Sequence, residues 1–172
     1  SEQLVKDIND YKPDFLYTHK NILVRIANYA KTNNVELWKP KLYAPISEML
    51  DAQSEALLKE MFGPGLLNAY GMSEVGSVAV RLPGSDEFYI NSDTHVCNIY
   101  DEDWKPSDDG MAEVTPPFKT DLPIINYTTY DRMETYERQG IRFVKKLLGR
   151  MNDVIRHKDG SVTEWGNLEV VV

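Results

Sequence analysis

Residues 70–74 place a hydroxyl and a carboxylate directly after the point where a buried strand is expected to end. The mostly apolar segment 66–70 follows the breaker segment 63–65, and this pattern is typical of a short buried strand. In open α/β sheets, ligands bind at the carboxyl ends of the strands. At such a position Ser73 can donate a hydrogen bond to a phosphate oxygen, and Glu74 can bind the Mg²⁺ that accompanies phosphates.

Two further residues of this segment suit a nucleotide. The ring of Tyr70 can stack on a nucleobase, and Gly71 makes this a glycine-containing loop in which a backbone amide can meet a phosphate. The same five residues also fit a tight turn with a solvated glutamate and a core tyrosine. Both interpretations stay open when these residues are taken alone.

Two later segments carry groups of the same kind. Asp131 follows the apolar residues 123–125, and an aspartate at the end of a strand can accept hydrogen bonds from both vicinal hydroxyls of a ribose. Its alternative is a turn aspartate paired with Arg132. Residues 149–153 join a glycine turn to a charged loop ahead of an expected strand.

A metal site has little support in the sequence. His95 and Cys97 are two residues apart on an expected strand and would share one face, which allows a two-ligand metal edge. A half-buried histidine beside a small cysteine is the alternative. Because the chain has three histidines and one cysteine, we expect no structural zinc site and no internal disulfide.

The first half of the chain predicts alternating strands and helices. Short extended segments are expected at residues 15–17, 41–44 and 66–70. Between the first two, apolar residues recur at helical spacing at Ile22, Leu23, Ile26, Ala27 and Ala30. A second helix is expected to begin at Ser47 as its N-cap and to stop at Gly63. This β-α-β-α-β order predicts a parallel sheet.

The second half predicts a β-rich region. Its extended runs are separated by turn residues, which is typical of hairpins and meanders, and they span residues 88–90, 95–100, 111–114 and 123–127. Near the end, an Asp-Gly turn at residues 159–160 predicts a further hairpin. The predicted fold class is therefore α/β, a parallel unit followed by a β-rich hairpin region.

The amino-acid composition argues against some classes of binding partner. The 172 residues carry 19 Lys and Arg against 27 Asp and Glu, a net charge of −8. An acidic chain lacks the basic face that a nucleic acid or an anionic membrane would need. The sequence has no apolar run near the roughly 20 residues that cross a membrane. The single cysteine fits a reducing cytoplasm, where we expect this chain to work, and its oligomeric state is left open.

In this order and spacing, the three polar segments resemble motifs of the adenylate-forming (AMP-binding) superfamily of acyl-CoA ligases and related enzymes. Residues 70–74 match Y-G-x-[ST]-E, residues 127–131 match Y-R-T-G-D, and residues 149–153 match the G-R-x-D-D hinge motif. The phenylacetate–CoA ligase branch is the most similar, through residues 70–76, 110–115 and 122–127. The resemblance covers nearly the whole chain.

The resemblance implies both an activity and roles for single residues. ATP and a small carboxylic acid would give an acyl-adenylate and pyrophosphate, and a thiol such as coenzyme A would then take the acyl group. Ser73 would touch the α-phosphate and Glu74 would hold Mg²⁺, so these two are the implied catalytic residues. The implied nucleotide-binding residues are Tyr70 at adenine, Gly71 in the same loop, Asp131 at the ribose hydroxyls and Arg150 reaching the ribose from the hinge.

The chain departs from the family pattern at three positions. Thr128, Tyr130 and Asn152 stand where the motifs have arginine, glycine and aspartate. These departures motivate an alternative from another class, a non-catalytic nucleotide-binding or interaction module with a decayed site. A third possibility is an adenylating enzyme that passes its acyl group to an acceptor other than coenzyme A. The sequence does not define the acid or the acceptor.

The resemblance also implies a domain division. Residues 1–148 would be the later part of the AMP-binding N-terminal domain, and residues 149–172 the hinge and the start of the C-terminal lid. The family's phosphate loop and its catalytic lysine have no counterpart in these 172 residues. We therefore expect a fragment of such an enzyme that does not turn over ATP by itself.

Overall fold

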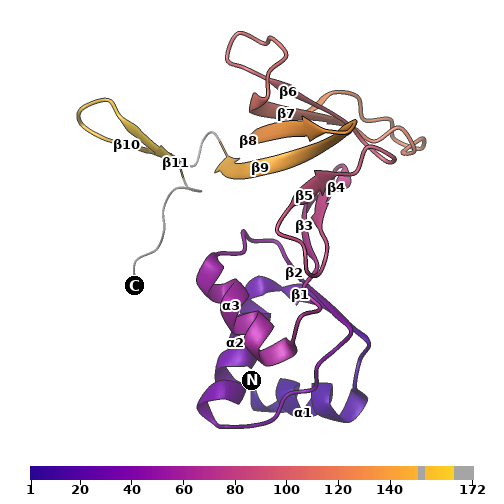
Figure 1. Ribbon diagram of the computed structural model, residues 1–172, viewed down its shortest axis with the longest axis vertical. Coiled ribbons are helices and arrows are strands. Elements are labelled where there is room, and N and C mark those ends of the chain that lie inside the picture. Colours follow the sequence, from indigo (N-terminus) through magenta and orange to yellow (C-terminus); the bar gives the residue numbers. More distant parts are fainter. Residues whose placement is uncertain (151–153, 165–172) are drawn as a thin grey trace. The chain divides into compact units, whose positions relative to one another are not determined.

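The computed structural model of the chain describes residues 1–150 and 154–164, which Figure 1 shows as ribbons. The chain divides into two compact units. The first contains Ser1–Ala69 and Arg81–Asp86, and the second contains Tyr70–Val80 and Glu87–Val172. Each unit is described by itself below.

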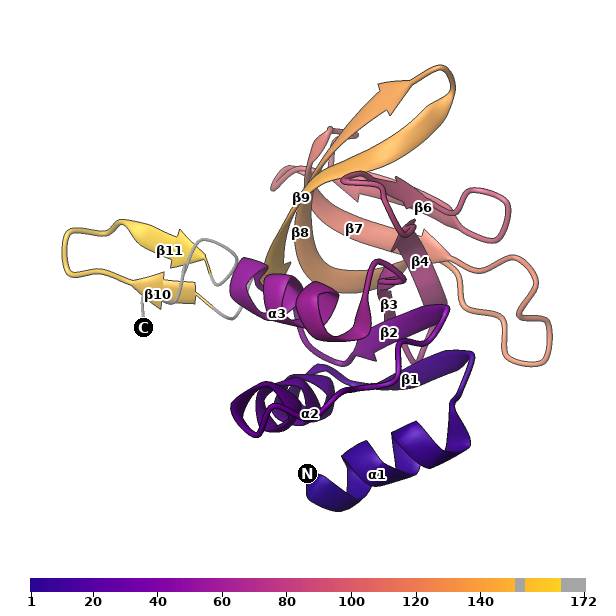
Figure 2. The ribbon, with the colours of Figure 1, turned by 60° about the horizontal axis from the view of Figure 1, so that its bottom comes forward.

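The first unit has the predicted alternation of helices and strands. In chain order its elements are α1 (Glu2–Tyr11), β1 (Phe15–His19), α2 (Lys20–Thr32), β2 (Leu42–Ile46) and α3 (Ala52–Phe62). Strands β1 and β2 pair in parallel, with Phe15 opposite Leu42. Figure 2 shows these two strands together with the three helices. No helix within residues 1–150 and 154–164 is long and apolar enough to cross a membrane.

A third extended segment lies parallel to β2. Tyr43 and Leu66 form a parallel bridge, in which the Tyr43 amide donates to the Gly65 carbonyl at 2.9 Å and the Leu67 amide donates to the Tyr43 carbonyl at 2.9 Å. The predicted β-α-β-α-β order is therefore present. Its third member continues into β3 (Asn68–Met72), which pairs with β4 (Gly76–Arg81) in a different sheet.

The core of the first unit confirms the helical stripe read from the sequence. Leu23, Ile26, Ala27 and Ala30 of α2 are buried against α3 and β2, together with Leu58, Phe62, Tyr43 and Leu66. The start predicted for the second helix was wrong. Asp51, not Ser47, is the N-cap of α3, because its carboxylate accepts the Ser54 amide at 2.8 Å, whereas Ser47 has a left-handed φ of 73°.

The second unit is built on a seven-stranded sheet with the order β3-β4-β5-β9-β8-β7-β6. Its further strands are β5 (Phe88–Ile90), β6 (Val96–Tyr100), β7 (Asp109–Thr115), β8 (Tyr127–Arg138) and β9 (Ile141–Arg150). Every pairing from β4 to β6 in this order is antiparallel. Two strands, β10 (Val154–Arg156) and β11 (Val162–Glu164), form the hairpin predicted from the Asp-Gly turn.

The long β8–β9 hairpin was not predicted from the sequence. It turns at Gln139 and Gly140, which have φ values of 55° and 76°, as a two-residue hairpin turn requires. The run expected at 123–127 contributes only Tyr127 to a strand. Charged and polar residues alternate irregularly along both strands of this hairpin, so the sequence lacks the regular period that marks a half-buried strand.

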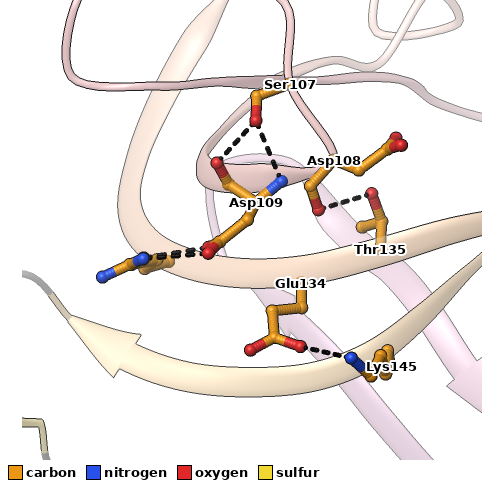
Figure 3. Close-up of polar contacts among 7 residues, drawn as sticks. Ser107, Asp108, Asp109, Glu134, Thr135 and Lys145 are labelled. Atoms are coloured by element: carbon orange, nitrogen blue, oxygen red, sulfur yellow. Dashed lines mark hydrogen bonds and ion pairs between the residues drawn. The ribbon is translucent and has the colours of Figure 1, made fainter.

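Polar contacts lie around the start of β7 and between β8 and β9 (Figure 3). The Thr135 hydroxyl donates to the Asp108 carbonyl at 3.1 Å, and the Ser107 hydroxyl donates to the Asp109 carbonyl at 2.8 Å. Between β8 and β9, the Lys145 ammonium lies 2.9 Å from the Glu134 carboxylate. Because the β8–β9 register shifts between Glu134 and Thr135, these contacts lie where the ladder itself is irregular.

Candidate functional site

A hydrogen bond joins the first two polar segments of the sequence. The Tyr70 hydroxyl on β3 donates to Asp131 Oδ2 on β8 at 2.7 Å. The ring of Tyr70 packs against both hydrophobic clusters of this unit. Burial and the Asp131 charge together raise the pKa of Tyr70 far above its usual value, so this phenol stays protonated and remains a donor at any physiological pH.

Arg150 brings the third segment to the same place. It stands opposite Asp131 in the β8–β9 register, and its Nε lies 3.8 Å from Asp131 Oδ1. The Arg150 side chain is 68% exposed, whereas that of Asp131 is 14% exposed. An ion pair of this length with an exposed arginine holds the guanidinium only weakly, so the Arg150 side chain can turn towards a bound anion or sugar.

A bulge in β8 aims the Asp131 carboxylate. Thr128 pairs with Glu113 and Arg132 with Met111, so residues 129–131 all face Ala112. The Thr129 hydroxyl donates to the Ala112 carbonyl at 3.0 Å and accepts the Asp131 amide at 3.1 Å. Bulges bend a strand and redirect its side chains. The bulge thus breaks the alternation of β8 immediately before Asp131.

The turn between β3 and β4 carries Ser73 and Glu74, both exposed. Two side chains hold its backbone: Lys119 Nζ donates to the Glu74 carbonyl at 2.7 Å, and His95 Nε2 donates to the Val75 carbonyl at 2.7 Å. Partial burial, followed by the neighbouring Glu74 carboxylate, raises the pKa of Tyr127. The Glu74 side chain therefore lies beside the strand that carries Asp131.

Gly71 is required by the close approach of β3 to β4. A β-carbon at this position would lie 2.3 Å from the Gly76 carbonyl oxygen and 2.8 Å from Ser77 Cα. Both atoms belong to the backbone and cannot move aside without separating the strands. The structure thus gives Gly71 a steric role at the base of the turn that presents Ser73 and Glu74.

Direct contacts in the structure join three of the six predicted site residues. Tyr70 and Arg150 each contact Asp131, whereas Gly71 lies in β3 and Glu74 lies in the turn that follows this strand. Ser73 lies in the same turn, but within the described part of the chain its hydroxyl bonds none of the other five. Asn152, the departure in the hinge motif, lies outside the described residues.

The surroundings of His95 and Cys97 are those of residues that stabilise the fold. His95 is buried, precedes β6, and its Nδ1 lies 2.8 Å from the Thr94 hydroxyl. Burial raises the pKa of the Cys97 thiol to about 11, so at neutral pH it is a protonated thiol of low reactivity. Across residues 1–150 and 154–164, no group of three or more His, Cys, Asp or Glu is placed to hold a metal ion.

Three positioning residues were missed by sequence reasoning: His95, Lys119 and Thr129. Each acts on the backbone of the site, through the Val75, Glu74 and Ala112 carbonyls respectively. Lys119 and Thr129 show no motif or periodicity in the sequence. His95 was considered only as a metal ligand beside Cys97 or as a half-buried histidine, because its bond to Val75 spans 20 residues.

His95→Ala is expected to lower the free energy of unfolding by about 2 kcal/mol, because it leaves the buried Val75 carbonyl without its donor and opens a small cavity. Urea denaturation checks this value. The matched control is His19→Ala, since His19 is exposed and its loss should change stability by less than about 0.5 kcal/mol. Equal effects of the two substitutions would show that the His95 contact does not hold the turn.

The fold of this chain is similar to that of several solved structures. No protein-family model matches the chain. The 2-hydroxyisobutyryl-CoA ligase in complex with 2-HIB-AMP matches it with a TM-score of 0.82 at 16% identity, over 95% of this chain and 38% of that one. The anthranilate CoA ligase AuaEII in complex with anthranoyl-AMP matches with a TM-score of 0.66 at 15% identity, over 94% and 34%. The chain has the fold of part of these CoA ligases.

Two further similarities agree with this fold. A mutant form of the coronafacic acid ligase from Pectobacterium brasiliense matches with a TM-score of 0.67 at 16% identity, over 98% of this chain and 35% of that one. Protein CapK of Staphylococcus aureus is 26% identical over 183 residues, which cover 98% of this chain and 38% of CapK. The chain thus spans well under half the length of these relatives. The predicted α/β fold class is confirmed.

Proposed function

We propose that this chain is part of an ATP-dependent enzyme that activates a carboxylic acid as its acyl-adenylate and then forms a thioester. The observation that carries the proposal is the Tyr70–Asp131 hydrogen bond with Arg150 beside it. It gathers three segments that the resemblance assigns to one nucleotide site. The structural relatives in complex with 2-HIB-AMP and anthranoyl-AMP support the same chemistry.

The geometry suits Asp131 to a ribose. The Tyr70 phenol holds Oδ2, which fixes the carboxylate so that its remaining lone pairs are aimed before a ligand arrives. A carboxylate can then accept both vicinal hydroxyls. Arg150 would turn from its weak pair with Asp131 towards the sugar, and the half-buried ring of Tyr70 would face adenine.

The β3–β4 turn suits the phosphates. Ser73 would donate to an α-phosphate oxygen, and Gly71 would keep the turn close to β4. Glu74 offers an exposed carboxylate, the hard oxygen ligand that Mg²⁺ takes in proteins, so the donor set fits that ion. Mg²⁺ held there would neutralise negative charge on the phosphates. The substrate carboxylate attacks the α-phosphorus and pyrophosphate leaves, which requires stabilisation of the developing charge by donors fixed in advance.

The proposal also includes the branch of the superfamily, the acyl acceptor, the compartment and the domain division. We place the chain in the phenylacetate–CoA ligase-like branch, with coenzyme A as the acyl acceptor and the cytoplasm as its compartment. Residues 1–148 would belong to the AMP-binding domain and residues 149–172 to the hinge and the start of the lid. Because the sequence holds no counterpart of the phosphate loop or the catalytic lysine, these 172 residues alone would not turn over ATP.

One observation favours a second candidate, a nucleotide-binding module without catalysis. Thr128 stands where the family motif has arginine, and its hydroxyl donates to Glu113 Oε1 at 3.3 Å. This residue is tied into the β7–β8 ladder and supplies no cation. A site that keeps Asp131 but lacks this charge would bind a nucleotide with less stabilisation of the transferring phosphate.

Pyrophosphate exchange into ATP tests the proposal in the intact protein that contains this chain. With a panel of carboxylic acids, we expect exchange that depends on the acid, and we expect Glu74→Gln to lower kcat by about 100-fold or more. Glu102→Gln, an exposed carboxylate in the loop after β6, is the matched control and should leave exchange unchanged. Nucleotide binding without exchange for any acid would contradict the enzyme and support the module.

A further inference from the structure

Tyr130 has a backbone conformation that disfavours its own residue type. Its φ is 59°, in the left-handed region where a β-carbon collides with the following carbonyl. Glycine, asparagine and aspartate account for most residues found there, and a bulky aromatic residue is uncommon. Glycine, which the family motif has at this position, would fit the same backbone without strain.

Within the described residues, the side chain of Tyr130 makes no hydrogen bond and no ring contact that would offset this strain. The residue is 56% exposed. Outside a tight turn, a bulky residue in this strained conformation is a candidate for a role in binding or catalysis, because such strain is concentrated at functional sites.

The position of Tyr130 in the bulge favours a role in binding. It lies in the β8 bulge directly before Asp131, whose carboxylate the Tyr70 phenol holds. The Tyr130 phenol is also among the groups that raise the pKa of Tyr127, after burial and Glu74, while Arg150 opposes them. Tyr130 is thus an exposed aromatic residue next to Asp131 in the chain, in the bulge that redirects the β8 side chains.

We propose that Tyr130 is a second aromatic contact for the nucleotide, packing its ring against the nucleoside that Asp131 holds and making the site prefer purine to pyrimidine nucleotides. This inference rests on the proposed function, because it requires a nucleoside at Asp131. Aromatic rings stack on any base, and larger purines offer more surface to such a ring. The strain at residue 130 would be retained because glycine there would remove the ring.

Three variants of the intact protein test this proposal, each measured for its unfolding temperature and for its dissociation constants with AMP and CMP by calorimetry. Tyr130→Gly should raise the unfolding temperature, because the strain is removed, and weaken AMP binding by about tenfold, the value of one lost base stack. Its preference for AMP over CMP should shrink. Tyr130→Phe keeps the ring and should retain both the affinity and the preference.

Gln139→Gly is the matched control. Gln139 is exposed and has a φ of 55°, so its replacement should raise the unfolding temperature similarly without changing AMP binding. If Tyr130→Gly gains stability while its AMP affinity and base preference stay those of the wild type, the proposal is overturned and Tyr130 is only a strained residue. A wild-type protein that binds no AMP at all would instead overturn the proposed function, and this inference with it.

Discussion

Asp131→Ala is expected to weaken the binding of AMP and Mg·ATP by at least about 100-fold. The substitution removes a charged acceptor for two ribose hydroxyls, and hydrogen bonds to charged groups are worth about 1.5–3 kcal/mol each. It also leaves the buried Tyr70 phenol without its acceptor, which should lower the free energy of unfolding by about 1–3 kcal/mol. Calorimetric titration and urea denaturation of the intact protein measure the two effects separately.

The Tyr70→Phe variant tests the role of the Tyr70 phenol separately from that of the Asp131 carboxylate. It keeps the ring but removes the hydrogen bond that fixes the Asp131 carboxylate, so the loss of affinity should be smaller, about tenfold. The double variant should bind no worse than Asp131→Ala, because the phenol acts on the nucleotide through that carboxylate. A double variant with fully additive losses would mean that the two residues contact the ligand independently.

Asp109→Ala is the matched control for Asp131. Asp109 lies on the neighbouring strand β7, and its carboxylate accepts hydrogen bonds from Arg132 Nε and Nη2 at 3.0 and 2.9 Å (Figure 3). Because both partners are about half exposed, its loss should cost less than about 1 kcal/mol of stability and should leave AMP binding unchanged. Wild-type affinity in Asp131→Ala would contradict the ribose role, whatever the control shows.

Gly71→Ala is expected to lower the free energy of unfolding by about 3 kcal/mol. Its new β-carbon would meet the Gly76 carbonyl oxygen at 2.3 Å, and relief of such overlap requires the backbones of β3 and β4 to separate. The turn that carries Glu74 would move with them, so nucleotide binding should fall as well. Urea denaturation of the intact protein measures the loss of stability.

Gly84→Ala provides the comparison for Gly71. Gly84 has no atom within 4 Å of its expected β-carbon, but its φ is 80°. Its substitution therefore carries only the conformational cost of a left-handed residue, about 1 kcal/mol. A Gly71→Ala protein no less stable than Gly84→Ala would show that β3 and β4 do not approach as closely as the structure has them.

Local sequence patterns determined much of the secondary structure. The stripe from Leu23 to Ala30 predicted α2, because the helical spacing of its apolar residues is a local property of the chain. The Asp-Gly turn predicted the β10–β11 hairpin for a similar reason. The start of α3 was wrong because Ser47 and Asp51 both have N-cap chemistry, and only the backbone shows which one precedes the helix.

The tertiary structure alone decided which groups meet. Tyr70 and Asp131 are 61 residues apart, and β4, β5 and β9 separate their strands in the sheet order. No period in the sequence encodes that order. The same holds for the bulge at residues 129–131, which depends on the pairing of β8 with β7, and for the His95 and Lys119 contacts that hold the β3–β4 turn.

The sequence by itself thus determined the α/β order of the chain and the three segments that resemble nucleotide-binding motifs. Both follow from residue types and short spacings, which local chain geometry translates directly into helices, strands and turns. The tertiary structure decided that a phenol from the first segment holds the carboxylate of the second beside the arginine of the third. Contacts of this kind depend on the strand order and register of the whole sheet, because each partner is brought to the site by a different strand.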